Sequence, residues 1–111
     1  MTTSQEKAIE RIRRLVEKEM KGIRGDKDCY EIKEWDLSEY EYFVSLVVEY
    51  GMKGDEGTLG EVFGRNRAQL FIGKKGGITY PVTKVLKNGE YKHYTKHFKG
   101  YSILQAVCDQ M

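Results

Sequence analysis

The sequence predicts an α+β fold: an N-terminal helix, an antiparallel sheet of four to five strands and a C-terminal helix, with the helices packed on one face of the sheet. Two observations predict this class. Apolar residues recur at three- and four-residue steps near both ends of the chain, whereas the middle alternates with a period of two. A length of 111 residues, 40% of them hydrophobic and 32% charged, fits a single globular domain over residues 1–111.

The first element is a helix expected at about residues 4–22. Thr3 and Glu6 have the spacing of a capping box, in which the threonine oxygen accepts an amide proton and the glutamate reaches back to the chain. Gly22 and Gly25 are expected to end the helix, because glycine readily adopts the left-handed conformation found at helix ends. The apolar stripe consists of Ile9, Ile12, Leu15, Val16, Met20 and Ile23.

Two strands are expected next. Residues 29–35 alternate loosely and are followed by a turn at 38–39. Residues 42–50 are predicted to form a strand at the centre of the sheet, because their β-branched and aromatic side chains divide between two faces. Residues 51–67 are rich in glycine and are expected to form a long loop with one helical turn at 58–63.

Residues 68–72 and 78–82 are predicted to be the third and fourth strands. Pro81 lacks the N–H that a strand ladder needs, so the fourth strand is expected to lie at a sheet edge there. Asn88-Gly89 is the typical signal of a type I′ hairpin turn, after which "EYKHYTKHF" returns as a further strand. An amphipathic helix is expected over residues 102–111.

The glycine-rich segment GKKGG, residues 73–77, has two interpretations. It is not a nucleotide-binding P-loop, because the lysines precede the second glycine, no Ser or Thr follows at the required place, and the segment leads into a strand. The plain interpretation is a hairpin turn with glycines at positive φ. The functional interpretation is an exposed basic tip that contacts phosphate.

Charge is distributed unevenly along the chain. Residues 1–60 hold ten Lys and Arg against fourteen Asp and Glu, a balance of −4, whereas residues 61–111 hold nine against three, a balance of +6. Such asymmetry indicates an electrostatic partner, although the acidic half folding against the basic half would also account for it.

Lysines interleave with aromatic residues and histidines over residues 87–101. Basic side chains contribute phosphate affinity and aromatic rings can stack on unpaired bases. The alternative is a solubilising edge strand, on which lysines prevent pairing with other chains. The residues predicted to bind nucleic acid are Arg65, Arg67, Lys74, Lys75, Lys92, Tyr94, Lys96 and Lys99.

The sequence predicts no catalytic residue, no metal site and no cofactor. His93 and His97 could bind a metal ion from one strand face with Cys108 as a third ligand, but four strand positions span about 13 Å, which is too far for two imidazoles to share an ion unless the strand bends. The acidic cluster at 26–34 lacks the glycine and the spacing of a calcium loop. Nothing in the sequence places Cys29 or Cys108 beside a histidine.

The leading functional hypothesis is therefore a nucleic-acid-binding module that uses the basic, tyrosine-rich surface of the C-terminal half. The alternative is a protein–protein interaction module or homodimeric adaptor without catalytic activity. An enzyme is least supported, because no acid–base pair or nucleophile is assembled by spacing. No apolar stretch long enough for a membrane span and no signal peptide is visible, and the two separated cysteines favour a cytoplasmic location.

Overall fold

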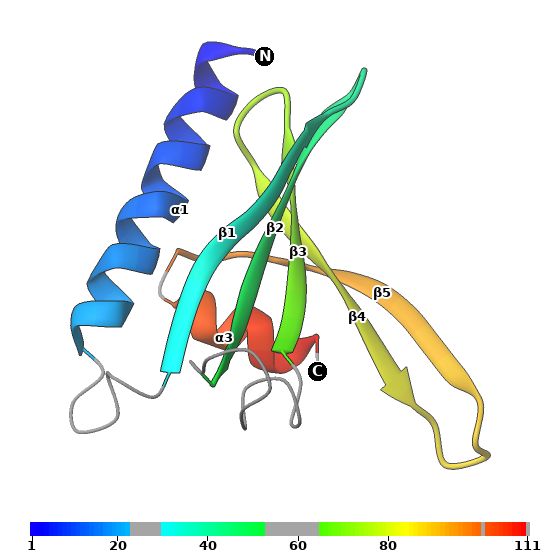
Figure 1. Ribbon diagram of the computed structural model, residues 1–111. Coiled ribbons are helices and arrows are strands. Elements are labelled where there is room, and N and C mark those ends of the chain that lie inside the picture. Colours follow the sequence, from blue (N-terminus) through cyan, green and yellow to red (C-terminus); the bar gives the residue numbers. More distant parts are fainter. Residues whose placement is uncertain (23–29, 53–64, 101, 111) are drawn as a thin grey trace.

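The described residues form two helices and five strands in the order that the sequence predicts (Figure 1). The computed structural model describes residues 1–22, 30–52, 65–100 and 102–110. The elements are α1 Thr3–Gly22, β1 Tyr30–Glu39, β2 Phe43–Met52, β3 Arg65–Gly73, β4 Ile78–Val85, β5 Tyr91–His97 and α3 Ile103–Asp109. The predicted α+β class, with a helix at each end of an antiparallel sheet, is confirmed.

The strands form one antiparallel sheet in the order β1-β2-β3-β4-β5, so each strand pairs with the next one along the chain. Alternate residues of β2, β3 and β4 point toward the helices and join apolar residues of α1 and α3 in one core. The largest fully buried apolar side chains of this core are Ile12, Val44, Leu46, Val48, Leu70, Ile72, Ile103 and Val107.

The capping box of α1 lies one residue earlier than the sequence predicts. Thr2 Oγ1 accepts a hydrogen bond from Gln5 N at 3.1 Å, and Gln5 Oε1 accepts one from Thr2 N at 2.8 Å. The pair Thr3 and Glu6 was therefore the wrong choice. Gln5 takes this role because its side chain is buried and its Nε2 also donates to Ile72 O of β3 at 3.2 Å.

β1 continues through Ser38 and Glu39, where the sequence predicts a turn. Its register against β2 shifts around Trp35, a bulge that adds one residue to β1. The turn comes after the strand instead, where Tyr40 N donates to Phe43 O at 2.9 Å.

Two tight hairpins join β3 to β4 and β4 to β5, and both have the same geometry. In the first, Gly76 N donates to Gly73 O at 2.8 Å and Gly73 N donates to Gly77 O at 2.9 Å. This is a type I turn followed by a glycine at positive φ, here Gly76 at 89°. Gly89 takes the same place in the second hairpin at 84°. Asn88 does not have the positive φ of a type I′ turn, so the second hairpin is confirmed but its predicted turn type is wrong.

β4 separates from β3 after a short ladder. The pairs are Ile72 opposite Ile78 and Phe71 opposite Thr79. Pro81, two residues after Thr79, occupies the next position that faces β3, and it has no N–H to donate. β4 is thus an interior strand rather than the predicted edge strand, but its side toward β3 carries no ladder from Pro81 onward.

The end of α3 fills the gap that β4 leaves beside β3. Gln69 N of β3 donates to Gln110 Oε1 at 2.8 Å, and Gln69 O accepts from Gln110 Nε2 at 3.0 Å. The side-chain amide thereby satisfies backbone groups that would otherwise need a strand partner. We call residues 78–97 the β4–β5 ribbon; it extends away from the helices toward its own turn (Figure 1).

Several sequence predictions fall outside the described residues. These are the strand start at Cys29, the helix stop at Gly25, the helical turn at 58–63 and most of the acidic cluster at 26–34. The backbone of Arg65 begins β3, but its side chain also lies outside the described part.

Candidate nucleic-acid interface

Most of the β4–β5 ribbon is exposed to solvent. All seven residues of β5 are exposed, as are the last three residues of β4. Near the turn, the Tyr91 side chain is 67% exposed and the Val85 side chain 62%. Only the root of the ribbon, where Tyr80 and Val82 point toward the helices, belongs to the core. The ribbon is therefore a two-stranded element with little packing to hold it.

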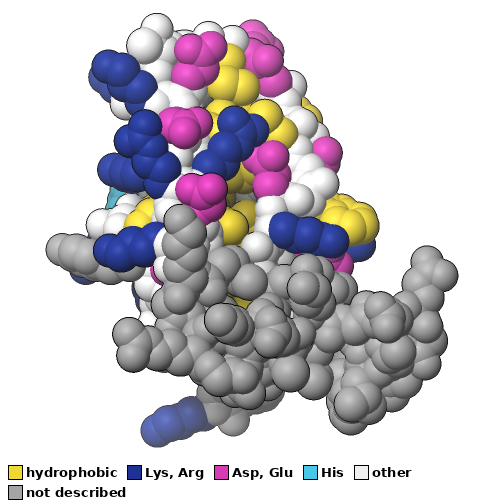
Figure 2. Space-filling view, turned by 60° about the vertical axis from the view of Figure 1, so that its left-hand side comes forward, with side chains coloured by type: hydrophobic (Ala, Val, Ile, Leu, Met, Phe, Trp, Pro, Cys, Tyr) yellow, Lys and Arg dark blue, Asp and Glu magenta, His cyan; other side chains and the backbone are white. Residues whose placement is uncertain are grey.

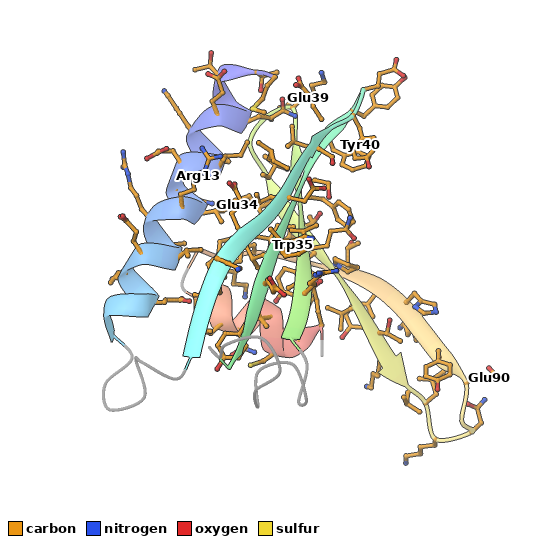
Figure 3. The ribbon with its side chains drawn as sticks, in the orientation of Figure 1. Arg13, Glu34, Trp35, Glu39, Tyr40 and Glu90 are labelled. Atoms are coloured by element: carbon orange, nitrogen blue, oxygen red, sulfur yellow. The ribbon has the colours of Figure 1, made fainter. Side chains whose placement is uncertain are left out.

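The part of the ribbon nearer its turn, residues 83–93, is called the distal ribbon, and it carries lysines that face each other. The register between the strands places Lys84 directly opposite Lys92. Within the described part of the chain, neither of them nor Lys87 has an ion pair or a side-chain hydrogen bond. Like charges in directly opposed positions destabilise a strand pair. The one acidic residue among residues 78–97 is Glu90, which lies at the far tip of the ribbon (Figure 3).

Tyr94 and Lys96 lie on the same face of β5 as Lys92, opposite Val82 and Tyr80 respectively. This face therefore contains three of the predicted contacts. Lys96 differs from Lys92 because its ammonium is held by Asp109 Oδ2 of α3 at 3.0 Å. It neutralises a carboxylate of the fold and is less available to a ligand than Lys92.

Asp109 is the centre of a polar network that fixes α3 to the root of the ribbon. Tyr80 Oη donates to Asp109 Oδ2 at 2.7 Å, and Gln105 Nε2 donates to Oδ1 at 2.9 Å. The hydrogen bonds from Tyr80 and Lys96 hold the pKa of the Asp109 carboxyl below its usual value. Burial raises the pKa of Tyr80 to about 12, and its hydrogen bond to the carboxylate adds to the shift.

Lys74 and Lys75 lie in the β3–β4 turn and contact the start of α1. Thr2 Oγ1 donates to Lys74 O at 2.7 Å. Beside this contact, Lys75 borders a cleft together with Lys7 and Arg11 of α1. The hairpin interpretation of residues 73–77 is thus confirmed, whereas phosphate binding by its lysines remains a prediction.

Arg67 lies on the opposite face of the sheet from the helices. Its guanidinium carbon sits 3.8 Å above the centre of the Trp35 ring, two strands away. Trp35 is 50% exposed and projects from β1 on the side away from α1 (Figure 3). Arg67 is therefore separated from the ribbon lysines by the sheet itself, and its planar group already has a stacking partner.

Further aromatic residues share this open face. The rings of Tyr40 and Phe43 stack with their centroids 4.9 Å apart, and Phe43 meets Phe71 edge to face at 5.5 Å. A shallow pocket of about 460 Å³ lies beside them, bordered also by Thr79 and His97. The aromatic side chains of this face contact one another and are not interleaved with the ribbon lysines.

The predicted residues whose side chains are described thus fall into four places. Lys92, Tyr94 and Lys96 share one ribbon face, Lys74 and Lys75 lie at the turn beside α1, and Arg67 is on the open face. Lys99 is exposed in the connection from β5 to α3. The single basic face that the sequence led us to expect is not formed by these residues.

Sequence reasoning missed Lys84, the partner of Lys92. A two-residue type I′ turn at Asn88-Gly89 pairs Lys84 with His93, because such a turn places positions 87 and 90 opposite each other. The observed turn is one residue longer, so the pairing moves by one position and brings Lys84 opposite Lys92. Knowledge of the turn type would have identified this pair.

No metal or nucleophile site emerges in the described ranges. No three His, Cys, Asp or Glu side chains among them are placed to hold a metal ion. His93 Nδ1 is hydrogen bonded with Thr83 Oγ1 at 3.0 Å, and Cys108 is an exposed free thiol. No helix within the described residues is long and apolar enough to cross a membrane.

The function of the chain cannot be taken from comparisons with known proteins. No family model, no curated protein and no solved structure matches it. We therefore infer the function from the chemistry of the described residues.

Proposed function

We propose that the protein binds duplex nucleic acid, most favourably DNA, by placing the distal β4–β5 ribbon in a groove. The observation that carries this proposal is the Lys84–Lys92 pair: two unpaired cations held directly opposite each other on an element that is exposed on both sides. A polyanion would neutralise both charges and relieve their repulsion.

The shape of the ribbon supports the same proposal. The major groove of B-DNA is about 12 Å wide and admits a two-stranded β-ribbon, whereas the major groove of A-form RNA is too narrow for side-chain readout. Lys87 in the turn and Tyr94 beside Lys92 extend the polar surface along both strands. Lysines at these positions would contact phosphates and so give affinity with little sequence preference. A cytoplasmic location is part of the same proposal.

The test removes the free ribbon lysines together. The variant Lys84→Ala, Lys87→Ala, Lys92→Ala is expected to bind a short DNA duplex more weakly in a fluorescence anisotropy titration. Its salt dependence should also flatten, because the slope of log affinity against log salt falls by about 0.9 for each lost phosphate contact.

Two controls separate the ribbon from net charge. The variant Arg13→Ala, Arg14→Ala, Lys18→Ala removes the same charge from the exposed surface of α1 and is expected to keep most of the affinity. Replacing the three ribbon lysines by arginine keeps the charge and should keep the salt slope. Equal loss in the ribbon and α1 variants, or no DNA binding by the unaltered protein, would refute the proposal.

The alternative is a protein partner, and the free edge of β5 favours it. This edge strand has no covering element in the described structure, and Tyr91 and Val85 add apolar surface beside it. In a fully overlapped antiparallel pairing of two β5 strands, Lys92 of one copy would face Lys96 of the other, which disfavours that homodimer. Light scattering over a range of protein concentrations tests the alternative: a dimer that survives the Lys92→Ala change would favour it.

A further inference from the structure

A second cationic site lies at the other end of the fold from the ribbon turn, between α1 and the β3–β4 turn. A cleft of about 300 Å³ is bordered there by Ser4, Lys7, Ala8, Arg11, Lys75 and Gly76. Two segments that are distant in the sequence thus contribute three cations and a hydroxyl to one hollow. The sequence pattern pointed to Lys75 but to none of the residues from α1.

The cations of the cleft have no ion-pair partner among the residues that the structure describes. Lys7 and Arg11 are one helical turn apart on the same face of α1, a spacing at which like charges destabilise a helix. Within the described residues neither of them nor Lys75 has an ion pair. The neighbouring carboxylate of Glu10 is directed to Arg14 instead, at 3.7 Å. Figure 2 shows several Lys and Arg side chains along the left-hand side of this view, with further ones at its centre and right among the Asp and Glu side chains.

The cleft is held in shape by contacts that do not involve its cations. Thr2 Oγ1 holds the turn through its hydrogen bond to Lys74 O, and the Gln5 amide holds the end of β3 just before the turn through its hydrogen bond to Ile72 O. The turn also presses closely against α1: a Cβ at Gly76 would lie 3.0 Å from Ser4 O. With φ at 89° and this approach, only glycine suits the position. The cleft is therefore a preformed hollow with three cationic residues along its border.

We propose that this cleft binds a phosphate group. Phosphate carries up to two negative charges and three acceptor oxygens, which match two ammonium groups, a guanidinium and the Ser4 hydroxyl. Arg11 would supply paired N–H donors, and Lys7 and Lys75 would act as point charges on either side. The phosphate belongs either to a free phosphate ester or to a nucleic-acid backbone, and the inference does not depend on the ribbon.

The test is a titration with inorganic phosphate at constant ionic strength, followed by amide NMR shifts and isothermal calorimetry. The expected result is saturable binding with shifts concentrated at Ser4, Lys75 and Gly76. Arg11→Ala and Lys75→Ala should each weaken phosphate binding by about 10- to 100-fold, the loss that a charge-assisted hydrogen bond predicts. Lys18→Ala, which removes a charge from α1 outside the cleft, should bind as the unaltered protein does.

The source of the phosphate follows from a second titration with a DNA duplex. If Arg11→Ala and Lys75→Ala weaken DNA binding in parallel with phosphate binding, the nucleic-acid backbone is the source; if DNA binding is unchanged, a free ester is. The ribbon triple variant should bind inorganic phosphate normally, so failure of the ribbon proposal leaves this one standing. The inference is overturned if phosphate does not saturate the unaltered protein, or if Lys18→Ala loses as much affinity as the cleft variants.

Discussion

The sheet contains two regions that differ in what stabilises them. In β2 and β3, alternate side chains such as Leu46 and Leu70 are buried under α1 and α3. In the distal ribbon, every side chain of β5 is exposed and Lys84 opposes Lys92. The first region is held by apolar burial, whereas the second relies on the ladder between its two strands, and an isolated two-stranded hairpin is marginally stable in water. The side chains of the distal ribbon do not take part in packing, and they are therefore available for contact with a partner.

The largest expected effect is in the buried region. Leu46→Ala should lower the free energy of unfolding by about 2–5 kcal/mol, because the Leu46 side chain is 1% exposed and its loss leaves a cavity. Val85→Ala truncates an aliphatic side chain at an exposed position of the ribbon and should cost less than about 0.5 kcal/mol. Urea denaturation of both variants measures the difference. Similar losses would show that the ribbon is as well packed as the core, contrary to the comparison.

A smaller effect is expected at Asp109, where the two regions meet. Asp109→Asn removes the charge that Lys96 and Tyr80 bind and should cost about 1–3 kcal/mol. Since the folded-state pKa of Asp109 is lowered, its contribution is complete above the ordinary aspartate pKa of about 4 and is lost as pH falls through the folded value.

Unfolding measured from pH 7 down to pH 2 should therefore show a steeper loss for the unaltered protein than for Asp109→Asn. Asp36→Asn controls for the removal of one exposed carboxylate on β1. Parallel pH curves for the unaltered protein and Asp109→Asn would mean that this carboxylate does not fix α3 to the ribbon.

The smallest effect is expected in the ribbon itself, and it has the opposite sign. Lys92→Glu replaces a repulsion across from Lys84 with an attraction and should stabilise the ribbon locally by about 0.2–1 kcal/mol. Amide hydrogen exchange across β4 and β5 measures this change. The exchange rates of Lys92→Gln should lie between those of the unaltered protein and those of Lys92→Glu. The same Glu variant should bind DNA more weakly. Faster exchange in Lys92→Glu would contradict the repulsion on which the proposed function depends.

The sequence predicts the first helix and the second strand best because these two have a clear period. The apolar stripe of α1 and the alternation of residues 43–50 hold over enough residues to identify a helix and a strand. Boundaries and registers depend on single residues instead. The bulge at Trp35 extends β1, and the extra residue in the β4–β5 turn moves every cross-strand pair of the ribbon by one position.

The candidate sites were predicted less completely than the fold. Charge counting singled out Lys75 and Lys92 but not Lys7 and Arg11, which belong to the acidic half of the chain. Which half-chain a cation belongs to says nothing about its spatial neighbours. The cleft exists because α1 crosses the β3–β4 turn closely, and this approach is set by tertiary contacts of buried Gln5 rather than by a local pattern.

The amide of Gln110 beside Gln69 has a consequence for the direction of the ribbon. The Gln110 side chain makes the two backbone hydrogen bonds that a neighbouring strand would make, and it lies beside β3 where β4 has separated from it. Without the Gln110 amide, the backbone N–H and C=O of Gln69 could form hydrogen bonds with a strand of another chain. We therefore expect that a change at Gln110 alters the direction of the ribbon and, with it, the position of Lys84 and Lys92.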